Sequence, residues 1–414
     1  MSDKKVRVPQ IRFAGFMGDW EERKLANICS MHARIGWQNL RTSEFLNTGD
    51  YYLVTGTDFD NGRINFDTCH YVEKERYDQD PKIQIDNGSI LITKDGTLGK
   101  VALVEGLDKP ATLNAGVFNV TIKTGNIDGK YIYQYLKAPF LMDYVSKHAT
   151  GGTIKHLNQN ILVDFPVLLP KKVEEQRKLG ELYHNLDNLI TLQQRQLDKL
   201  AIVKKTMLEK MFPKDGANVP EIRFAGFKGA WEQRKLSAMT DYKNGKGHED
   251  RQSDNGKYEL INLNSISIDG GLKHSGKFVD ETEDTLVEND LVMVLSDVGH
   301  GDLLGRVALI PENDRFVLNQ RVALLRPNNT VDPQFLFSHI NAHQQYFKTQ
   351  GAGMSQLNIS KGSVEGFTSW VPHKEEQIKI GELFSNLDNL ITLHQRELNA
   401  LKTLKKSMLQ QLFV

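Results

Sequence analysis

The sequence predicts an α+β protein in which two β-rich mixed domains are joined by two long helices that form an antiparallel coiled coil. Three observations predict this pseudo-two-fold tandem repeat: duplicated sequence blocks, two long stretches with helical apolar spacing, and strand-like segments between turn signals. The expected order is a mixed domain with its N-terminal anchor over residues 1–170, a spacer helix over 171–213, a second mixed domain with its anchor over 214–372, and a second spacer helix over 373–414.

Two blocks of sequence occur twice. The first, which we call the anchor segment, spans residues 8–25 and recurs over 219–236 with 14 of 18 positions identical. The second spans residues 174–212 and recurs over 375–413 with 24 of 39 positions identical. The regions between the blocks, which we call the interiors, have lost most of their similarity. Uneven drift after an old duplication is one explanation. However, the largely surface-exposed helix has stayed similar while the adjoining interior has not, which favours interiors that diverged for different targets.

Short fragments still relate the two interiors. Gly99-Lys100-Val101 matches Gly305-Arg306-Val307, and Leu113-Asn114 matches Leu318-Asn319. Farther along, Leu157-Asn158 is paired with Leu357-Asn358. The spacing between partners changes along the chain, so insertions and deletions separate the fragments.

Residues 174–211 read as one long helix, and the second copy reads the same way. Apolar residues recur in steps of three and four, the signature of a coiled-coil seam. The seam is expected to contain Leu182, Leu186, Leu189, Leu197, Leu200, Leu383, Leu387, Leu390, Leu398 and Leu401, continued by Val203 and Leu404. Polar Gln193 and His394 interrupt it at matched places, where two steps of four suggest a stutter that locally unwinds the supercoil. His394 reads as a tolerated polar seam residue without a ligand. An antiparallel pairing is expected to place the two interiors at opposite ends of the spacer.

Each interior contains three runs typical of buried strands and one short helix. Turn dipeptides such as Asn61-Gly62 and Asp95-Gly96 punctuate these runs. The expected strands cover residues 89–93, 101–104, 117–122, 291–295, 307–310 and 322–325, and the expected helices cover residues 130–136 and 333–341. This pattern predicts a mixed domain with a β-rich core.

Composition excludes several classes of protein. The 52 basic and 52 acidic residues give a net charge of zero, and both interiors are mildly acidic, so a nucleic-acid-binding face must be a local basic patch. Two cysteines exclude a disulfide framework and a cysteine-based zinc site. No apolar run reaches the length of a membrane span and no signal peptide is seen, which favours a cytoplasmic protein. Phosphate-loop, zinc-protease and methyltransfer motifs are absent, so nothing in the sequence favours an enzyme.

Two loops in each interior contain candidate binding residues. The loop over residues 94–100 resembles a phosphate-cradling loop without its spacing, and a tight turn between strands is the better interpretation. The loop over 150–158 and its counterpart over 351–358 are glycine-rich and polar, with different Lys, His and Gln residues in the two copies. Such side chains make base-edge contacts in DNA, although ordinary surface or turn-stabilising roles are the alternative. The candidates are Lys94, Lys100, Lys155, His156, Asn158, Arg306, Arg321, Gln356 and Asn358.

The junctions between interiors and helices resemble a known family. Residues 152–158, then 165–170, then Glu175-Gln176 and a long helix are similar to the corresponding junction in the DNA-specificity subunit of type I restriction–modification enzymes. The second copy, from Leu357-Asn358 to 371–378, resembles it equally, and the anchors around Trp20 and Trp231 fit the start of each target-recognition domain. The resemblance covers essentially the whole chain.

The resemblance implies a non-catalytic specificity subunit that reads an asymmetric bipartite site in double-stranded DNA, one half with each target-recognition domain. It also implies two methyltransferase (modification) subunits docked on the helices and two restriction subunits that act as translocase and nuclease. This chain is then expected to bind no cofactor and no metal, with S-adenosylmethionine, ATP and Mg on the partner subunits, and no membrane. A coiled-coil adaptor without DNA specificity is the alternative, and a nuclease with an unrecognised site is a third possibility.

Overall fold

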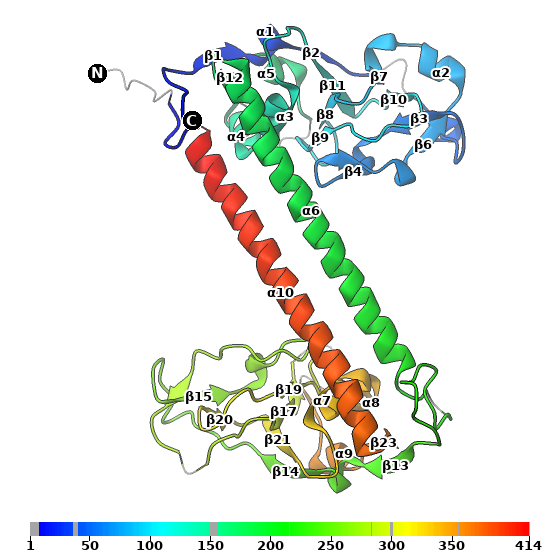
Figure 1. The fold of residues 1–414 in the computed structure, drawn as a ribbon, viewed down its shortest axis with the longest axis vertical. Coiled ribbons are helices and arrows are strands. Elements are labelled where there is room, and N and C mark those ends of the chain that lie inside the picture. The colour runs from blue at the N-terminus through cyan, green and yellow to red at the C-terminus, as the bar shows by residue number, and fades with distance from the viewer. Residues whose placement is uncertain are drawn as a thin grey trace. The chain divides into compact units, whose positions relative to one another are not determined.

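A computed structural model of the chain describes residues 8–35, 40–148, 156–214, 216–282, 284–298, 301–354 and 356–413. It divides into two compact units. Unit 1 comprises residues 1–194 and 396–414, and unit 2 comprises residues 195–395. Each long helix therefore contributes one part to each unit (Figure 1).

Unit 1 combines short strands with several short helices and one part of each long helix. Its helices are α1 (Leu25–Ile28), α2 (Lys74–Asp78), α3 (Gly129–Lys137), α4 (Pro139–His148), α5 (Gln159–Val163), the first part of α6 (Val173–Lys210) and the last part of α10 (Lys374–Leu412). Its strands are β1 (Glu21–Lys24), β2 (Cys29–His32), β3 (Tyr51–Val54), β4 (Phe59–Asp60), β5 (Arg63–Ile64), β6 (His70–Val72), β7 (Gln84–Ile85), β8 (Ile90–Thr93), β9 (Val101–Leu103), β10 (Ala111–Leu113), β11 (Val117–Ile122) and β12 (Pro166–Leu169).

Unit 2 repeats this plan with fewer strands. Its helices are the last part of α6, α7 (Pro333–Ala342), α8 (Gln344–Thr349), α9 (Lys361–Glu365) and the first part of α10. Its strands are β13 (Glu232–Lys235), β14 (Thr240–Asn244), β15 (Tyr258–Ile261), β16 (Phe278–Val279), β17 (Leu291–Val294), β18 (Ser296–Asp297), β19 (Val307–Leu309), β20 (Phe316–Leu318), β21 (Val322–Pro327), β22 (Leu357–Asn358) and β23 (Thr368–Val371).

The main sheets of the two units share one topology. The order β2-β11-β8-β9 in unit 1 matches β14-β21-β17-β19 in unit 2, with every neighbouring pair antiparallel. A second sheet contains a parallel pair in both units, β3 with β10 and β15 with β20. In unit 1 the two sheets lie beside one another, with α3 next to the end of the main sheet (Figure 1). The expected α+β tandem repeat is therefore confirmed.

The two long helices pair antiparallel, and each unit shows this by itself. In unit 1, Asp187 pairs with Lys405 at 2.6 Å, while Tyr183, earlier on α6, stacks on Phe413, later on the chain. In unit 2, Lys204 pairs with Asp388 at 2.5 Å, while Phe212 stacks on Phe384. Because the residue number falls along one helix as it rises along its partner, both contacts require opposite directions.

The seam differs from the expected one at two steps. Leu189 and Leu390 are 48% and 44% exposed, and the more buried neighbours Ile190 and Ile391 take their places. The inward positions 186, 190, 193, 197, 200 and 204 then follow alternating steps of four and three, as do their equivalents in α10. The expected stutter is therefore wrong. Leu189 lies about 100° around the helix from Ile190, which turns it outward.

The other expected seam residues face inward to different degrees. Leu186, Leu387 and Leu398 are buried, whereas Leu182, Leu197, Leu200, Leu383 and Leu401 are half-buried. Val203 and Leu404 are exposed because Lys204 and Lys405 occupy the inward position and pair with aspartates across the seam.

The expected helices α3 and α7 are present, but the described residues form further helices. The interior of unit 1 also contains α2, α4 and α5 as well as the short α1 at its start, and that of unit 2 contains α8 and α9. In unit 1, α3 ends at Lys137 because Ala138 precedes Pro139 and takes an extended conformation, and α4 starts at the proline. Small helices α5 and α9 then precede the last strand of each interior. They are only five residues long, so their sequences show no helical period.

One pairing of fragments is wrong. The backbone amide of Leu157 donates to the carbonyl of Lys94 at 2.8 Å, and the equivalent amide in unit 2 belongs to Ile359, which donates to Leu295 at 2.9 Å. The next residues, Asn158 and Ser360, are the N-caps of α5 and α9. Leu157-Asn158 is therefore equivalent to Ile359-Ser360. The Leu-Asn dipeptide two residues earlier, at 357–358, forms strand β22 instead.

Candidate functional site

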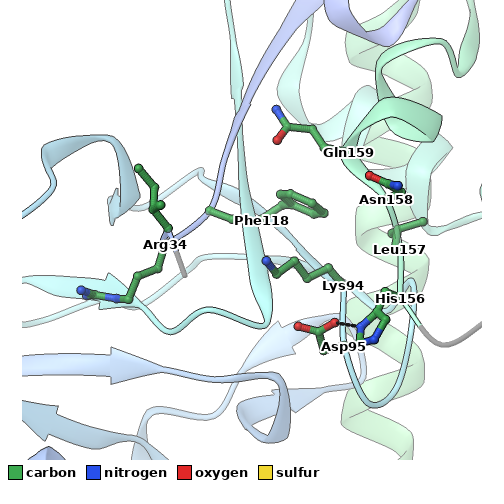
Figure 2. Close-up of a pocket in the computed structure, with 10 residues that line it drawn as sticks. Arg34, Lys94, Asp95, Phe118, His156, Leu157, Asn158 and Gln159 are labelled. Atoms are coloured by element: carbon green, nitrogen blue, oxygen red, sulfur yellow. Dashed lines mark hydrogen bonds and ion pairs between the residues drawn. The ribbon is translucent and has the colours of Figure 1, made fainter. Parts of the chain in front are cut away.

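A hollow of about 550 Å³ opens in unit 1 where β8 ends and α5 begins (Figure 2). Its floor includes the half-buried stem of Lys94 and the ring of Phe118, with the Lys94 ammonium 5.6 Å from the ring centroid. The lining consists of Ala33, Arg34, Ile35, Lys94, Asp95, Phe118, His156, Leu157, Asn158 and Gln159. The hollow thus combines an apolar floor with charged and amide groups at its rim.

Backbone hydrogen bonds hold the walls of the hollow in place. The Lys94 amide donates to the carbonyl of Gly116 at 2.8 Å, which ties the end of β8 to the turn before β11. The Leu157 amide donates to Lys94 on the other side, and Leu157 is buried in the core beneath. Gln159 extends its amide to the carbonyl of Met31 at 3.2 Å. Side chains on the rim are therefore displayed from fixed backbone rather than from a free loop.

His156 and Asp95 face each other across the rim. The Nδ1 atom of His156 lies 2.6 Å from Oδ1 of Asp95 (Figure 2). The His156 side chain is 76% exposed, so the remaining edge of its imidazole ring is open to a ligand. This pair is joined by the Lys94 ammonium and the amides of Asn158 and Gln159 in lining one concave surface. Such groups suit hydrogen bonds with the edges of bases and with phosphate oxygens.

Arg34 lines the hollow but its guanidinium points away from it (Figure 2). Nε donates to the carbonyl of Leu113 at 2.9 Å, and Nη2 reaches the hydroxyl of Thr112 at 3.3 Å. Burial lowers the pKa of Arg34, and the nearby charge of Arg76 lowers it further. Arg34 therefore ties the main sheet to strand β10 and is not a ligand-binding residue.

The candidates predicted in unit 1 separate into three groups. Lys94, His156 and Asn158 meet in the hollow. Lys100 is exposed on the turn between β8 and β9, outside the lining of the hollow. Lys155 lies outside the described residues.

Unit 2 has different side chains at the equivalent backbone positions. Leu295 takes the place of Lys94, since its amide donates to the carbonyl of Arg321 at 2.9 Å and its carbonyl accepts from Ile359. Ser296 takes the place of Asp95 and its hydroxyl donates to Oδ1 of Asn358 at 2.5 Å. Gln356 donates to the same hydroxyl. The predicted residues Gln356 and Asn358 therefore lie together in an amide cluster.

The two arginine candidates of unit 2 lie apart from that cluster. Arg306 is half-buried, its Nη1 donates to the carbonyl of Asn341 at 3.4 Å, and burial lowers its pKa. It therefore supports helix α7. Arg321 is exposed in a left-handed backbone conformation (φ 67°), where the matched residue of unit 1 is Gly116. Its carbonyl supports Leu295, and its side chain reaches the surface.

Asp95, Phe118, Gln159 and Ser296 are site residues that the sequence reasoning missed. Gln159 directly follows the predicted loop and Asp95 lies inside another, so adjacency was a usable signal for both. Phe118 is a buried strand residue by its sequence pattern, and only the sheet register brings it to the hollow. Ser296 carried no signal, since Ser is common in loops and turns.

A clamp at the start of each long helix joins residues that are identical in the two copies of the duplicated blocks. Arg12 of the first anchor segment forms a bidentate ion pair with the buried Glu175 at 2.6 and 2.8 Å. Arg223 of the second anchor segment binds Glu376 in the same way, at 2.7 Å for both bonds. These charge-assisted pairs fix each anchor segment on the helix that follows its interior.

Glutamines beside the clamps fasten the interiors to the helices. Gln176 accepts from the amide of Asp128 at 2.9 Å and donates to the carbonyl of Pro170 at 2.9 Å. Gln377 accepts from Asp332 and donates to Pro372, each at 2.9 Å. The Glu-Gln dipeptides that mark the two junctions in the sequence are therefore structural.

In the part of the chain that the structure describes, no group of three or more His, Cys, Asp and Glu side chains is arranged to hold a metal ion. None of the described helices is long and apolar enough to cross a membrane.

Comparisons with known proteins agree on one family. The sequence model described as the type I restriction modification DNA specificity domain matches residues 17–201 and again 228–403. The MjaVIII specificity subunit of a type I restriction enzyme from Methanocaldococcus jannaschii is 24% identical, covering 80% of this chain and 79% of that protein. The MjaIX specificity subunit from the same organism is 21% identical, covering 78% and 76%.

A crystal structure has the same fold. The S subunit of a type I restriction–modification system from M. genitalium superposes with a TM-score of 0.71 at 16% identity, covering 98% of this chain and 99% of that one. Together with the repeated family match over most of the sequence, this shows that the chain belongs to the family of type I restriction–modification DNA-specificity subunits.

Proposed function

We propose that each unit reads one half of an asymmetric bipartite site in double-stranded DNA, and that the hollow of unit 1 and the amide cluster of unit 2 are the reading surfaces. The observation that carries this proposal is the replacement of Lys94 and Asp95 by Leu295 and Ser296 on equivalent backbone. Divergence at displayed positions on an unchanged scaffold is what two different half-sites require. Base edges in the major groove are distinguished by such donors and acceptors.

We propose that residues 1–170 and 214–372 act as target-recognition domains and residues 171–213 and 373–414 as conserved spacer helices. The spacer would then set the number of unspecified base pairs between the half-sites. Deleting about seven residues, which is two turns, from one helix should alter that number or abolish activity while the bases of each half-site stay the same. A changed base preference would argue against the spacer role.

We infer that two methyltransferase subunits dock on the helices. Leu189 and Leu192 on α6 are 48% and 53% exposed, and their equivalents Leu390 and Leu393 on α10 are 44% and 51% exposed. Exposed leucines at matched places on two duplicated helices suit two copies of one partner. Two restriction subunits complete the proposed assembly, which acts on DNA in the cytoplasm.

We infer that the chain itself performs no catalysis and binds no cofactor, with S-adenosylmethionine, ATP and Mg bound by its partners. In support of this, the sequence has no motif for phosphoryl or methyl transfer. The purified chain with Mg²⁺ should leave duplex DNA intact. Cleavage by the isolated chain would favour a nuclease instead.

The direct experiment is to co-express the chain with its methyltransferase subunit in a host without endogenous adenine methylation, and to map methylated adenines across the genome. A single bipartite motif should be methylated, and the methyltransferase subunit expressed alone should give none. If the pair methylates no motif although the complex forms, the chain is an adaptor without DNA specificity.

A further inference from the structure

We propose that Asp95 is a positioning residue that holds His156 so that Nε2 of the imidazole faces the DNA and contacts one base pair of the half-site read by unit 1. This inference rests on the proposed function of the hollow. It adds a residue outside the predicted candidates and a chemical role for the histidine. The contact that carries it is the 2.6 Å approach of His156 Nδ1 to Asp95 Oδ1.

The identity of the atoms fixes the orientation of the ring. An ionised carboxylate only accepts hydrogen bonds, so Nδ1 must carry the hydrogen and donate it to Asp95. The second nitrogen, Nε2, is then the group left for a ligand. In the neutral ring Nε2 accepts, which suits the amino group of cytosine or adenine. In the protonated ring Nε2 donates, which suits the acceptors on guanine.

Asp95 is itself held in place by the fold. It follows Lys94, whose amide and carbonyl are both hydrogen-bonded, at 2.8 Å each, to the turn before β11 and to Leu157. His156 directly precedes the buried Leu157. Both members of the pair therefore stand next to anchored backbone, and a contact made through Nε2 is placed in advance of binding.

Few charged groups face the pair. Lys94, at the end of β8, is the cation of the hollow, and Phe118 on β11 presents an apolar ring. Asn158 and Gln159, at the start of α5, are neutral. The guanidinium of Arg34 turns away to the carbonyl of Leu113. Among these described neighbours Asp95 is the one acid, so it is the acceptor that holds the imidazole ring.

Unit 2 provides the internal comparison. Ser296 stands where Asp95 stands in unit 1, and it is hydrogen-bonded to the amides of Asn358 and Gln356. We therefore expect recognition through an oriented imidazole in the half-site of unit 1 and through side-chain amides in the half-site of unit 2.

The test uses the complex of the full chain with its methyltransferase subunit. Binding is measured to duplexes that carry the mapped motif, and to duplexes with each base pair substituted in turn. The variants are Asp95→Ala, Asp95→Asn, His156→Ala and the double alanine variant. Asp143→Asn, which removes an exposed acid of unit 1 outside the hollow, is the matched control.

Wild type should discriminate at one base pair of the unit 1 half-site by about tenfold. Asp95→Ala and His156→Ala should each remove that discrimination, and the double variant should lose no more than either single one. Asp95→Asn should keep most of it, because Asn Oδ1 still accepts from Nδ1. The other half-site and the Asp143→Asn control should behave as wild type.

Two results would overturn the inference while leaving the proposed function in place. One is a wild-type motif whose bases are read unchanged by Asp95→Ala and His156→Ala. The other is additive losses in the double variant, since they would show that the two side chains act separately. Absence of any sequence preference in the wild-type complex would instead contradict the proposed function itself.

Discussion

The clamps of the two units use the same residue types, whereas the proposed reading surfaces have different side chains at equivalent backbone positions. Arg12 with Glu175 and Arg223 with Glu376 have nearly the same geometry. Lys94 and Asp95, on the other hand, correspond to Leu295 and Ser296. The difference teaches that the two copies retain the contacts that fasten each interior to the helices and differ in the residues displayed beyond them.

Substitutions in the aromatic clusters at the helix ends should give the largest matched losses of stability in the two units. Phe413 packs on Tyr131, Tyr135, Phe140 and Tyr183, and Phe212 packs on Trp231, Phe335, His339 and Phe384. Phe413→Ala and Phe212→Ala should each cost about 3–5 kcal/mol of the free energy of unfolding, because both rings are buried. Hydrogen exchange should show the loss in unit 1 for the first and in unit 2 for the second. The exposed Met17→Ala serves as control.

The clamps should give the next largest effect. Glu175→Ala and Glu376→Ala each leave an arginine without its buried partner, which should cost about 3 kcal/mol in urea unfolding. The preceding glutamates are exposed, so Glu174→Ala and Glu375→Ala are matched controls with little expected effect. Unequal losses of unfolding free energy in the two variants would contradict the idea that the two clamps play the same structural role.

Two glycines test how closely each interior approaches its helix. A Cβ atom at Gly180 would lie 2.7 Å from the backbone nitrogen of Tyr131, and one at Gly381 would lie 2.8 Å from that of Phe335. Gly180→Ala and Gly381→Ala should therefore each cost about 1–3 kcal/mol through overpacking. Gly125→Ala, with open space around it, should cost far less. Thermal unfolding of the three variants measures this, and a Gly180→Ala protein as stable as wild type would contradict it.

A buried histidine should make unit 2 more sensitive to acid than unit 1. Burial, and then the neighbouring His343, hold the pKa of His339 well below its ordinary value. The equivalent residue of unit 1 is Tyr135, whose pKa burial raises to about 12. The unfolded state therefore takes up a proton that the folded unit 2 rejects, and stability falls as pH drops below the ordinary histidine pKa.

The expected loss approaches about 1.4 kcal/mol for each pH unit below about 6.5. It should be visible as faster hydrogen exchange in unit 2 between pH 6.5 and 5. His339→Tyr, which copies the residue of unit 1, should flatten this slope. An equally steep slope in the variant would show that other groups dominate.

The repeat, the long helices and the principal strands could be predicted from the sequence because they depend on local period and on identity between copies. The predicted seam was wrong at Leu189 because two adjacent apolar residues, Leu189 and Ile190, fit the helical period about equally well. Only the partner helix decides which of them turns inward. The Leu-Asn pairing failed for a similar reason, since a shared dipeptide carries no information about backbone hydrogen bonds.

The candidate site was predictable in part. The loops containing Lys94, His156 and Asn158 stood out by composition, and the fold brings them into one hollow. The contact of Asp95 with His156 joins residues 61 positions apart. Such a contact depends on sheet register and on the packing of Leu157, and neither can be predicted from local sequence. Arg306 was a candidate as a cation in a loop, but it is half-buried and its Nη1 donates to the carbonyl of Asn341 in helix α7.

The most direct test of the central claim is to make the two reading surfaces identical. Residues 26–164 can replace residues 237–366, because the same backbone hydrogen bond flanks both segments. The amide of Leu25 donates to the carbonyl of Phe165, and that of Leu236 donates to the carbonyl of Phe367, each at 2.8 Å. The complex of this exchanged chain with the methyltransferase subunit should methylate DNA that carries two copies of the half-site read by unit 1. The half-site of unit 2 should be absent from the methylated motif. Persistence of the original asymmetric motif would contradict the claim that the interiors carry the specificity.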